Sequence, residues 1–426
     1  TLFRSDNSAK LFNGNEFNTN RIELVSPNII ASSRRQLDRI EEVTDSETGA
    51  TYMRYLYVFK AGTPALGSRF NPILISSAKE FETYINQENN ESNFNYSYYR
   101  LISDIDYGDY AYNNSTYKTK LRGYFEGNFM TISGISLISS EGLTSAGLFA
   151  EVEKVSSRSD SVGAVLNLNI APVVVSFSNA DTVGAVVGRL KNGTVANVDL
   201  QINATNETNI VVGKNISGGV VGVALGNSVI KNVHSDFGAK ARNQNPTDLV
   251  SNNFSDENSS FATYSFAGSV VGVLGGESTL YGVETDNTIS VLGGKAGFLI
   301  GLVDTRARAE SLKLQNHNSN ILNAYTYGGL VVGQVNGKLS DVEVVADTSG
   351  ESFKNVRLVP YIADAIGGVV GRVNGGILEN IKTNQSIETS SMGSSDGIES
   401  LGGVIGVVAE KQASIKNVCV DDVKLV

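Results

Sequence analysis

Short apolar runs broken by glycine recur along most of the chain. In the clearest stretch, residues 217–233 (SGGVVGVALGNSVIKNV), two aliphatic residues stand between two glycines, and an Asn flanked by aliphatic residues follows. Successive copies are 34, 50, 29, 32, 38 and 35 residues apart, measured between their second glycines. Such a period predicts stacked repeats, each burying its apolar face on its neighbours. The seven second glycines are Gly188, Gly222, Gly272, Gly301, Gly333, Gly371 and Gly406.

Each repeat is predicted to be extended rather than helical. Val, Ile, Gly and Asn dominate it, and these residues favour strands and turns over helix interiors. The run between the glycines is also too short for a helix. Each copy therefore indicates a strand, a turn and a second strand. Stacking such strands in register predicts an all-β fold with parallel sheets, a β-solenoid.

Alternation along the first strand predicts which positions face the core. The residues two before and two after the second glycine are apolar in every copy, so we expect them to point inward with the glycine, which leaves room for a bulky side chain from another wall. The residue after the glycine is polar in Arg189, Gln334 and Arg372, which indicates an outward face.

By the same alternation, the residue before the second glycine faces outward, yet it is always a β-branched aliphatic residue. Same-face neighbours stabilise a sheet, which is one explanation of this column. The other is that another segment or a partner covers it, because long exposed apolar patches are uncommon. The column consists of Val187, Val221, Val271, Ile300, Val332, Val370 and Ile405.

An Asn marks the second strand at Asn197, Asn232, Asn380 and Asn417, and Gly282, Ser311 and Asp341 replace it elsewhere. Aliphatic residues lie two before and one after this position, a spacing that breaks alternation and predicts a bend. Asn tolerates left-handed backbone angles. Aligned amides in successive coils can also bond one another as a ladder. We interpret these Asn as structural.

The glycine-rich core with its trailing aliphatic-x-Asn resembles the GLUG repeat of bacterial secreted and surface proteins. Segments 71–85, 98–107 and 121–137 look like the coil that precedes such repeats, so the resemblance covers roughly residues 71–426. It implies a right-handed parallel β-helix, here of about eight or nine coils, on an extracellular or cell-surface and often adhesin-like bacterial protein. It carries over no catalytic residue, because the family shares none.

Three parts are expected along the chain: a small segment or the tail of a preceding domain at 1–70, a capping coil at 71–145, and the repeats at 146–426. Residues 31–43 are predicted to form a short helix that begins at Ser32 or Ser33, and 51–62 a strand. Ser77 and Glu80 form a capping box, predicting a helix that closes the N-terminal end of the stack. The polar insert 237–265 is predicted to be an extruded loop that carries function.

Composition limits the partners. The formal charge is −10, which argues against nucleic acid and anionic membranes as partners, since both require a basic surface. A single cysteine, Cys419, excludes an internal disulfide. No apolar stretch is long enough to insert directly into a membrane. The chain starts at Thr1 and shows no signal peptide, so we expect a mature or excised segment.

One metal site is a candidate. Asp104, Asp106 and Asp109 surround Gly108 as in part of a calcium loop, without its later glutamate. The alternative is that these residues end a strand and turn the chain. The tyrosines of 96–124 either pack the cap, stack on sugars or anchor a protein interface. No other cofactor is expected.

Enzyme chemistry is not expected. His234 and His317 have no neighbours at metal-ligand spacing, and no nucleophile elbow is present. Asp199, Glu284, Glu343 and Glu379 lie near the second strand but are judged to differ in offset. The favoured function is a structural or adhesion module whose loops bind a glycan or protein ligand. The alternatives are a polysaccharide-active enzyme and a passive spacer that assembles with further domains or copies.

Overall fold

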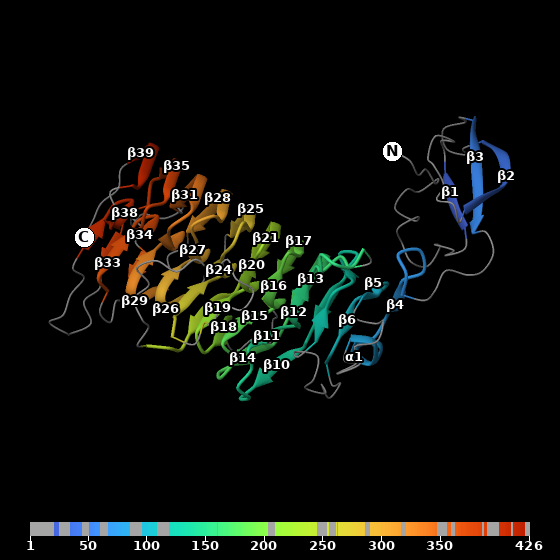
Figure 1. The fold of residues 1–426 in the computed structure, drawn as a ribbon, viewed down its shortest axis with the longest axis horizontal. Coiled ribbons are helices and arrows are strands. Elements are labelled where there is room, and N and C mark those ends of the chain that lie inside the picture. The colour runs from blue at the N-terminus through green and yellow to red at the C-terminus, as the bar shows by residue number, and fades with distance from the viewer. Residues whose placement is uncertain are drawn as a thin grey trace.

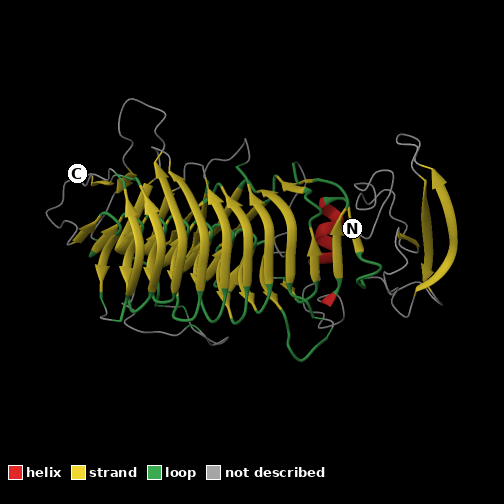
Figure 2. Ribbon diagram, turned by 90° about the horizontal axis from the view of Figure 1, so that it is seen from above, coloured by secondary structure: helices red, strands yellow, loops and turns green. Residues whose placement is uncertain are grey.

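In the computed structural model, three long parallel sheets run side by side along one axis (Figures 1 and 2). They contain every strand described from residue 67 onward, which confirms the predicted parallel, all-β, solenoid-like organisation. The structure describes residues 21–24, 35–44, 51–59, 67–85, 96–108, 119–159, 161–202, 209–244, 254, 261, 263–285, 290–316, 321–346, 356–358, 363–385, 387–389, 400–409 and 412–421.

Sheet 1 has 14 strands: β10 (Ser136–Ser139), β11 (Ser145–Ala146), β14 (Val174–Phe177), β15 (Thr182–Gly184), β18 (Ile210–Gly213), β19 (Ile216–Gly218), β22 (Gly238–Ala241), β23 (Phe266–Gly268), β26 (Ser290–Gly297), β29 (Ile321–Gly329), β32 (Val356–Leu358), β33 (Ala365–Gly367), β36 (Ile387–Thr389) and β37 (Ser400–Gly402). Sheet 2 has nine: β7 (Lys120–Leu121), β12 (Phe149–Glu153), β16 (Val187–Lys191), β20 (Val221–Leu225), β24 (Val271–Leu274), β27 (Ile300–Val303), β30 (Val332–Val335), β34 (Val370–Val373) and β38 (Ile405–Val408).

Sheet 3 has 13 strands: β4 (Ile73–Ile75), β5 (Tyr98–Leu101), β6 (Ile105–Asp106), β8 (Tyr124–Glu126), β9 (Thr131–Ser133), β13 (Ala164–Ala171), β17 (Thr194–Leu200), β21 (Val229–Ser235), β25 (Thr279–Thr285), β28 (Arg308–Asn316), β31 (Lys338–Ala346), β35 (Ile377–Thr383) and β39 (Ser414–Val420). A typical repeat contributes β19 to sheet 1, β20 to sheet 2 and β21 to sheet 3. Each strand pairs in parallel with its counterpart in the next repeat.

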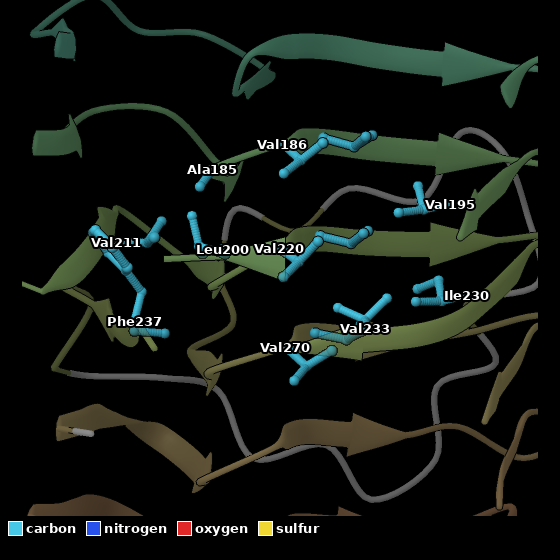
Figure 3. Packing of buried hydrophobic residues seen from close by; sticks show 14 of the residues in the cluster. Ala185, Val186, Val195, Leu200, Val211, Val220, Ile230, Val233, Phe237 and Val270 are labelled. Carbon is cyan, nitrogen blue, oxygen red and sulfur yellow. The ribbon is translucent and has the colours of Figure 1, made fainter. Parts of the chain in front are cut away.

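The main core lies between the sheets. Figure 3 shows Val186, Val220 and Val270 from successive repeats stacked beside Val195 and Ile230, all without solvent exposure. The aliphatic column before the second glycine belongs to this same core, with only Ile405 partly buried. The prediction that this column faces outward was therefore wrong.

The error arises at the corner before the glycine. Gly219 and Val220 bend the chain between β19 and β20, and Val221 is the first residue of its strand. The N–H groups of Val220 and Val221 both donate to the Val270 oxygen, over 3.1 and 2.9 Å. Alternation counted along the strand does not extend into such a corner.

A Cβ on Gly222 would lie 2.5 Å from the Gly188 oxygen and 2.8 Å from the Val183 oxygen. Glycine is required at Gly222 because backbone atoms of sheets 1 and 2 lie against it, and no bulky side chain occupies this space. At Gly272 a side chain does approach, because a Cβ there would lie 2.4 Å from Cγ2 of Ile216.

A second apolar cluster, separate from the main core, forms beside sheets 1 and 2. It joins Val223, Val273 and Leu302, which follow the second glycine, to Phe254 and Phe261. Both phenylalanines come from the insert predicted as an extruded loop, and each is 2% exposed. A segment of the chain therefore does cover an outward column, but it is the column after the glycine. Residues 238–241 of the insert form β22 of sheet 1, so the loop prediction was wrong there. Most of the rest of the insert lies outside the described residues.

The second strand bends at the Asn position. All of these residues have left-handed backbone angles, including Asn197 (φ 53°), Asn232 (φ 51°) and Gly282 (φ 67°). Side-chain amides connect successive coils, with Nδ2 of Asn232 donating to Oδ1 of Asn197 over 3.0 Å. The same bond joins Asn417 to Asn380 over 2.9 Å, so the predicted bend and ladder are both present.

Helix α1 (Ala78–Ile85) lies at the N-terminal end of the sheets (Figure 2). Ser77 Oγ accepts a hydrogen bond from the Glu80 N–H over 3.2 Å, as in the predicted capping box. The Glu80 carboxylate accepts the Ser76 N–H instead of the N–H of Ser77. Phe81 is fully buried in the main core, 5.8 Å from the Phe125 ring, so this helix packs over the core.

Near the N-terminus, β1 (Arg21–Leu24), β3 (Thr51–Phe59) and β2 (Arg35–Thr44) form a separate antiparallel sheet. The strand prediction for 51–62 is confirmed over residues 51–59, and residues 60–62 lie outside the described residues. The helix prediction for 31–43 was wrong, because β2 pairs along β3 from Arg35 to Thr44. Tertiary pairing here overrides a weak local helix preference.

Candidate functional site

A column of polar side chains crosses sheet 3 from strand to strand. Each member from Asp199 to Lys382 lies two positions after the bend residue of its coil. Parallel register places them one beside the next: Asn169, Asp199, His234, Glu284, Lys313, Glu343 and Lys382. The sequence prediction that the carboxylates differ in offset was wrong for Asp199, Glu284 and Glu343. Only Glu379 lies outside this column.

Opposite charges alternate along the column. Lys313 Nζ forms an ion pair with Glu284, and Lys382 Nζ lies 3.2 Å from Glu343 Oε1. These side chains are substantially exposed, so each pair contributes little stability on its own. Asp199 and His234 continue the pattern at the other end when the imidazole is protonated.

His234 lies between two carboxylates. Its Nδ1 is 2.8 Å from Asp199 Oδ1, and its Nε2 is 3.4 Å from Asp236 Oδ1. The protonated imidazole has two N–H donors, which suits this arrangement. The hydrogen bond from His234, helped by that from Gln201 Nε2, lowers the pKa of Asp199 against the opposing effect of burial. Asp199 therefore remains a charged acceptor.

An open groove of about 510 Å³ lies over this end of the column. Its lining includes Asp199, His234, Glu284, Asn232 and Phe129. Gly282, which replaces the ladder Asn, also lines it. Because Gly282 carries no amide, the ladder stops there, and no hydrogen bond to Asn232 Oδ1 is found from the described residues.

Phe129 projects from a tight turn at the edge of the groove. The Met130 N–H donates to the Gly127 oxygen over 2.9 Å, and both central residues, Asn128 (φ 54°) and Phe129 (φ 57°), are left-handed. This is a type I′ turn, and a bulky residue at such an angle is a strained exception. Asn169 Nδ2 donates a hydrogen bond to the backbone oxygen of Phe129 over 2.9 Å, whereas the Phe129 side chain is 63% exposed.

The groove thus combines an exposed aromatic ring with carboxylate, amide and imidazole groups. Aromatic rings pack on apolar faces, and the carboxylates and amide oxygens accept hydrogen bonds. Such a set suits a ligand with many hydroxyl groups and an apolar face.

The candidate calcium residues are used differently. Asp104 Oδ1 accepts the Thr131 N–H over 2.7 Å, and Asp106 Oδ1 accepts the Gly108 N–H over 3.0 Å. Asp109 lies outside the described residues. Within the described ranges, no group of three or more His, Cys, Asp or Glu side chains is arranged to hold a metal ion. The two aspartates stabilise the turns around β6 and β9.

Two of the five described tyrosines in segment 96–124 are buried in the cap, and the other three are half-buried. Tyr99 and Tyr107 are 3% and 1% exposed, and burial raises the pKa of Tyr99. Tyr98 and Tyr124 stack on each other at 5.3 Å between ring centres. Tyr110, Tyr112 and Tyr117, like His317, lie outside the described residues.

Comparisons with known proteins identify no relative of this chain. A scan against protein-family models finds no match, and comparisons with curated proteins and with solved structures find no significant similarity. Among the described residues, no helix is long and apolar enough to cross a membrane.

Proposed function

We propose that this chain is a right-handed parallel β-helix of about eight or nine coils from an extracellular or bacterial cell-surface protein, and that it acts as a binding or adhesion module. The resemblance to GLUG repeats supports the location and the handedness. The ligand is a glycan, bound in the groove between Phe129 and His234. The exposed Phe129 ring beside Asp199 and Glu284 is the observation that carries this proposal.

The geometry favours a saccharide over a protein ligand. Protein interfaces typically bury flat areas with several anchoring aromatic residues, whereas this groove offers one ring and a dense set of hydrogen-bonding groups. The bends and the amide ladder hold Asn232 and Asp199 on a regular sheet, so little ordering is required when a ligand binds.

Calorimetric titration of the full chain with neutral oligosaccharides of several linkages tests this function. Phe129→Ala and Asp199→Asn are each expected to weaken binding about tenfold or more, corresponding to about 1.4 kcal/mol. Ile138→Ala is the matched control, since Ile138 is 47% exposed on β10 and outside the groove. Absence of binding to every oligosaccharide, or equal binding by all variants, contradicts the proposal.

A polysaccharide hydrolase is the second candidate, because Asp199 and Glu284 flank His234 in the same groove. Paired carboxylates on opposite sides of a glycosidic bond can act as acid and base. Incubating the bound oligosaccharide with the protein and measuring new reducing ends separates the two. If the protein releases reducing ends and both Asp199→Asn and Glu284→Gln abolish this release, the hydrolase is supported. If the oligosaccharide stays intact, the binding module is supported.

A further inference from the structure

A cationic notch lies on the edge where sheet 2 strands turn into sheet 3 strands. The turn between β27 and β28 consists of Asp304–Ala307, whereas the next turn, between β30 and β31, has only Asn336 and Gly337. The short turn leaves a space of about 750 Å³ beside its longer neighbours. Gly337 packs directly on the longer turn, because a Cβ there would lie 2.1 Å from the Asp304 oxygen.

Positive charge predominates in this notch. Arg306, Arg308 and Lys338 line it, and the acidic residue among the lining side chains is Glu277. Arg306 Nη1 pairs with Glu277 Oε1 at 3.1 Å. This concentration of basic side chains contrasts with the formal charge of −10 for the whole chain.

Two of the cations are direct neighbours. Arg308 and Lys338 occupy paired positions on β28 and β31, and like charges directly opposite each other in a sheet destabilise it. The charge of Lys338 is balanced by two carboxylates, because its Nζ lies 3.9 Å from Glu310 and 3.6 Å from Glu379. Arg308 forms no ion pair with any described residue. An anion placed between them would relieve this repulsion.

We propose that the notch binds the carboxylate or sulfate group of an acidic saccharide. Arginine presents a planar fork of donors that matches such oxyanions. The space exceeds that of one small ion, and Ile377, which is 42% exposed, supplies an apolar wall for the rest of a sugar unit. This site lies at the beginning of β25 and β28, whereas the groove at Phe129 and His234 lies toward the ends of the sheet 3 strands, so the two proposals are independent.

The test is calorimetric titration of the full chain with oligogalacturonate, a sulfated dextran oligomer, neutral dextran and inorganic sulfate. One or both acidic oligomers are expected to bind, more tightly than inorganic sulfate and with an affinity that falls as salt rises. Arg308→Gln is expected to weaken this binding about tenfold. Glu277→Gln is expected to strengthen it, because a competing carboxylate is removed.

Arg242→Gln is the matched control, because it removes one positive charge from an exposed position outside the notch. Arg242→Gln is expected to bind the acidic oligomers within about twofold of the unsubstituted chain. The same is expected of Phe129→Ala, and this result would show that the acidic oligomers bind at the notch and not in the groove. No binding by either acidic oligomer, equal losses in Arg308→Gln and Arg242→Gln, or inorganic sulfate binding as tightly as the oligomers overturns the proposal.

Discussion

The backbone N–H of Phe254 donates a 2.7 Å hydrogen bond to Oδ2 of Asp304, fifty positions later in the chain. Asp304 has no solvent exposure, and its partner lies in the long insert between two repeats. The bond and the second apolar cluster together anchor this part of the insert on the sheets. An element that looked like a free loop in the sequence is, at Phe254 and Phe261, part of the packing.

Phe254→Ala should destabilise the protein by about 3 kcal/mol, because a fully buried ring is lost from the second cluster. Urea unfolding followed by circular dichroism measures this change. Phe129→Ala is the control, since that ring is mostly exposed and its loss should cost little. Equal stability of the two variants would show that the insert does not depend on Phe254 for its position.

Asp304→Asn should change the pH dependence of stability. Burial raises the pKa of Asp304 above its usual value, so the folded state holds this proton more strongly than the unfolded state. The resulting stability is present below the ordinary pKa of Asp and is lost as pH rises through the raised pKa. The difference in unfolding free energy between Asp304→Asn and the unsubstituted chain should therefore shift in favour of Asn as the pH rises above about 4. A constant difference would contradict the raised pKa.

Gly222→Ala should destabilise the stack by about 2 kcal/mol or more, because its Cβ would meet backbone oxygen atoms that cannot move separately. Gly142→Ala is the control, since a Cβ there has no neighbour within 4 Å. Thermal unfolding of both variants checks the prediction. A large loss at Gly142 or none at Gly222 would contradict the close approach of sheets 1 and 2.

Asn232→Ala and Asn232→Gly separate the two roles of the ladder. Both remove the amide that donates to Asn197, but only Ala adds strain at a left-handed backbone angle. Ala should therefore be less stable than Gly by about 1 kcal/mol in chemical unfolding. If Ala is as stable as Gly, the backbone angle is not what selects the residue at this position.

The sequence was a good guide to the stack because each repeat carries its own signals. Gly222 marks the close approach and Asn232 marks the bend, and both recur at similar spacing. The side of sheet 2 that Val221 occupies was not predictable by alternation, because Val221 lies at the corner between β19 and β20 and alternation holds only along a continuous strand. Strand β2 was also missed, because its pairing with β3 is a tertiary interaction.

Only part of the groove could be predicted from the sequence. Gly282 in an Asn position was visible, as was the uniform offset of Asp199 and Glu284 from their bend residues, and this offset should have predicted the polar column. Phe129 gave no signal, because a left-handed angle at a bulky residue does not follow from local preference.

The alternating charges of sheet 3 also distinguish one coil from another. The backbone of each repeat would stack on any other, since glycine corners and Asn bends are shared. A chain without the coil that carries Lys313 would bring Glu284 beside Glu343, and two carboxylates would then face each other. The column therefore gives each of these coils a preferred neighbour, and it opposes the slippage by one repeat that an otherwise uniform stack would permit.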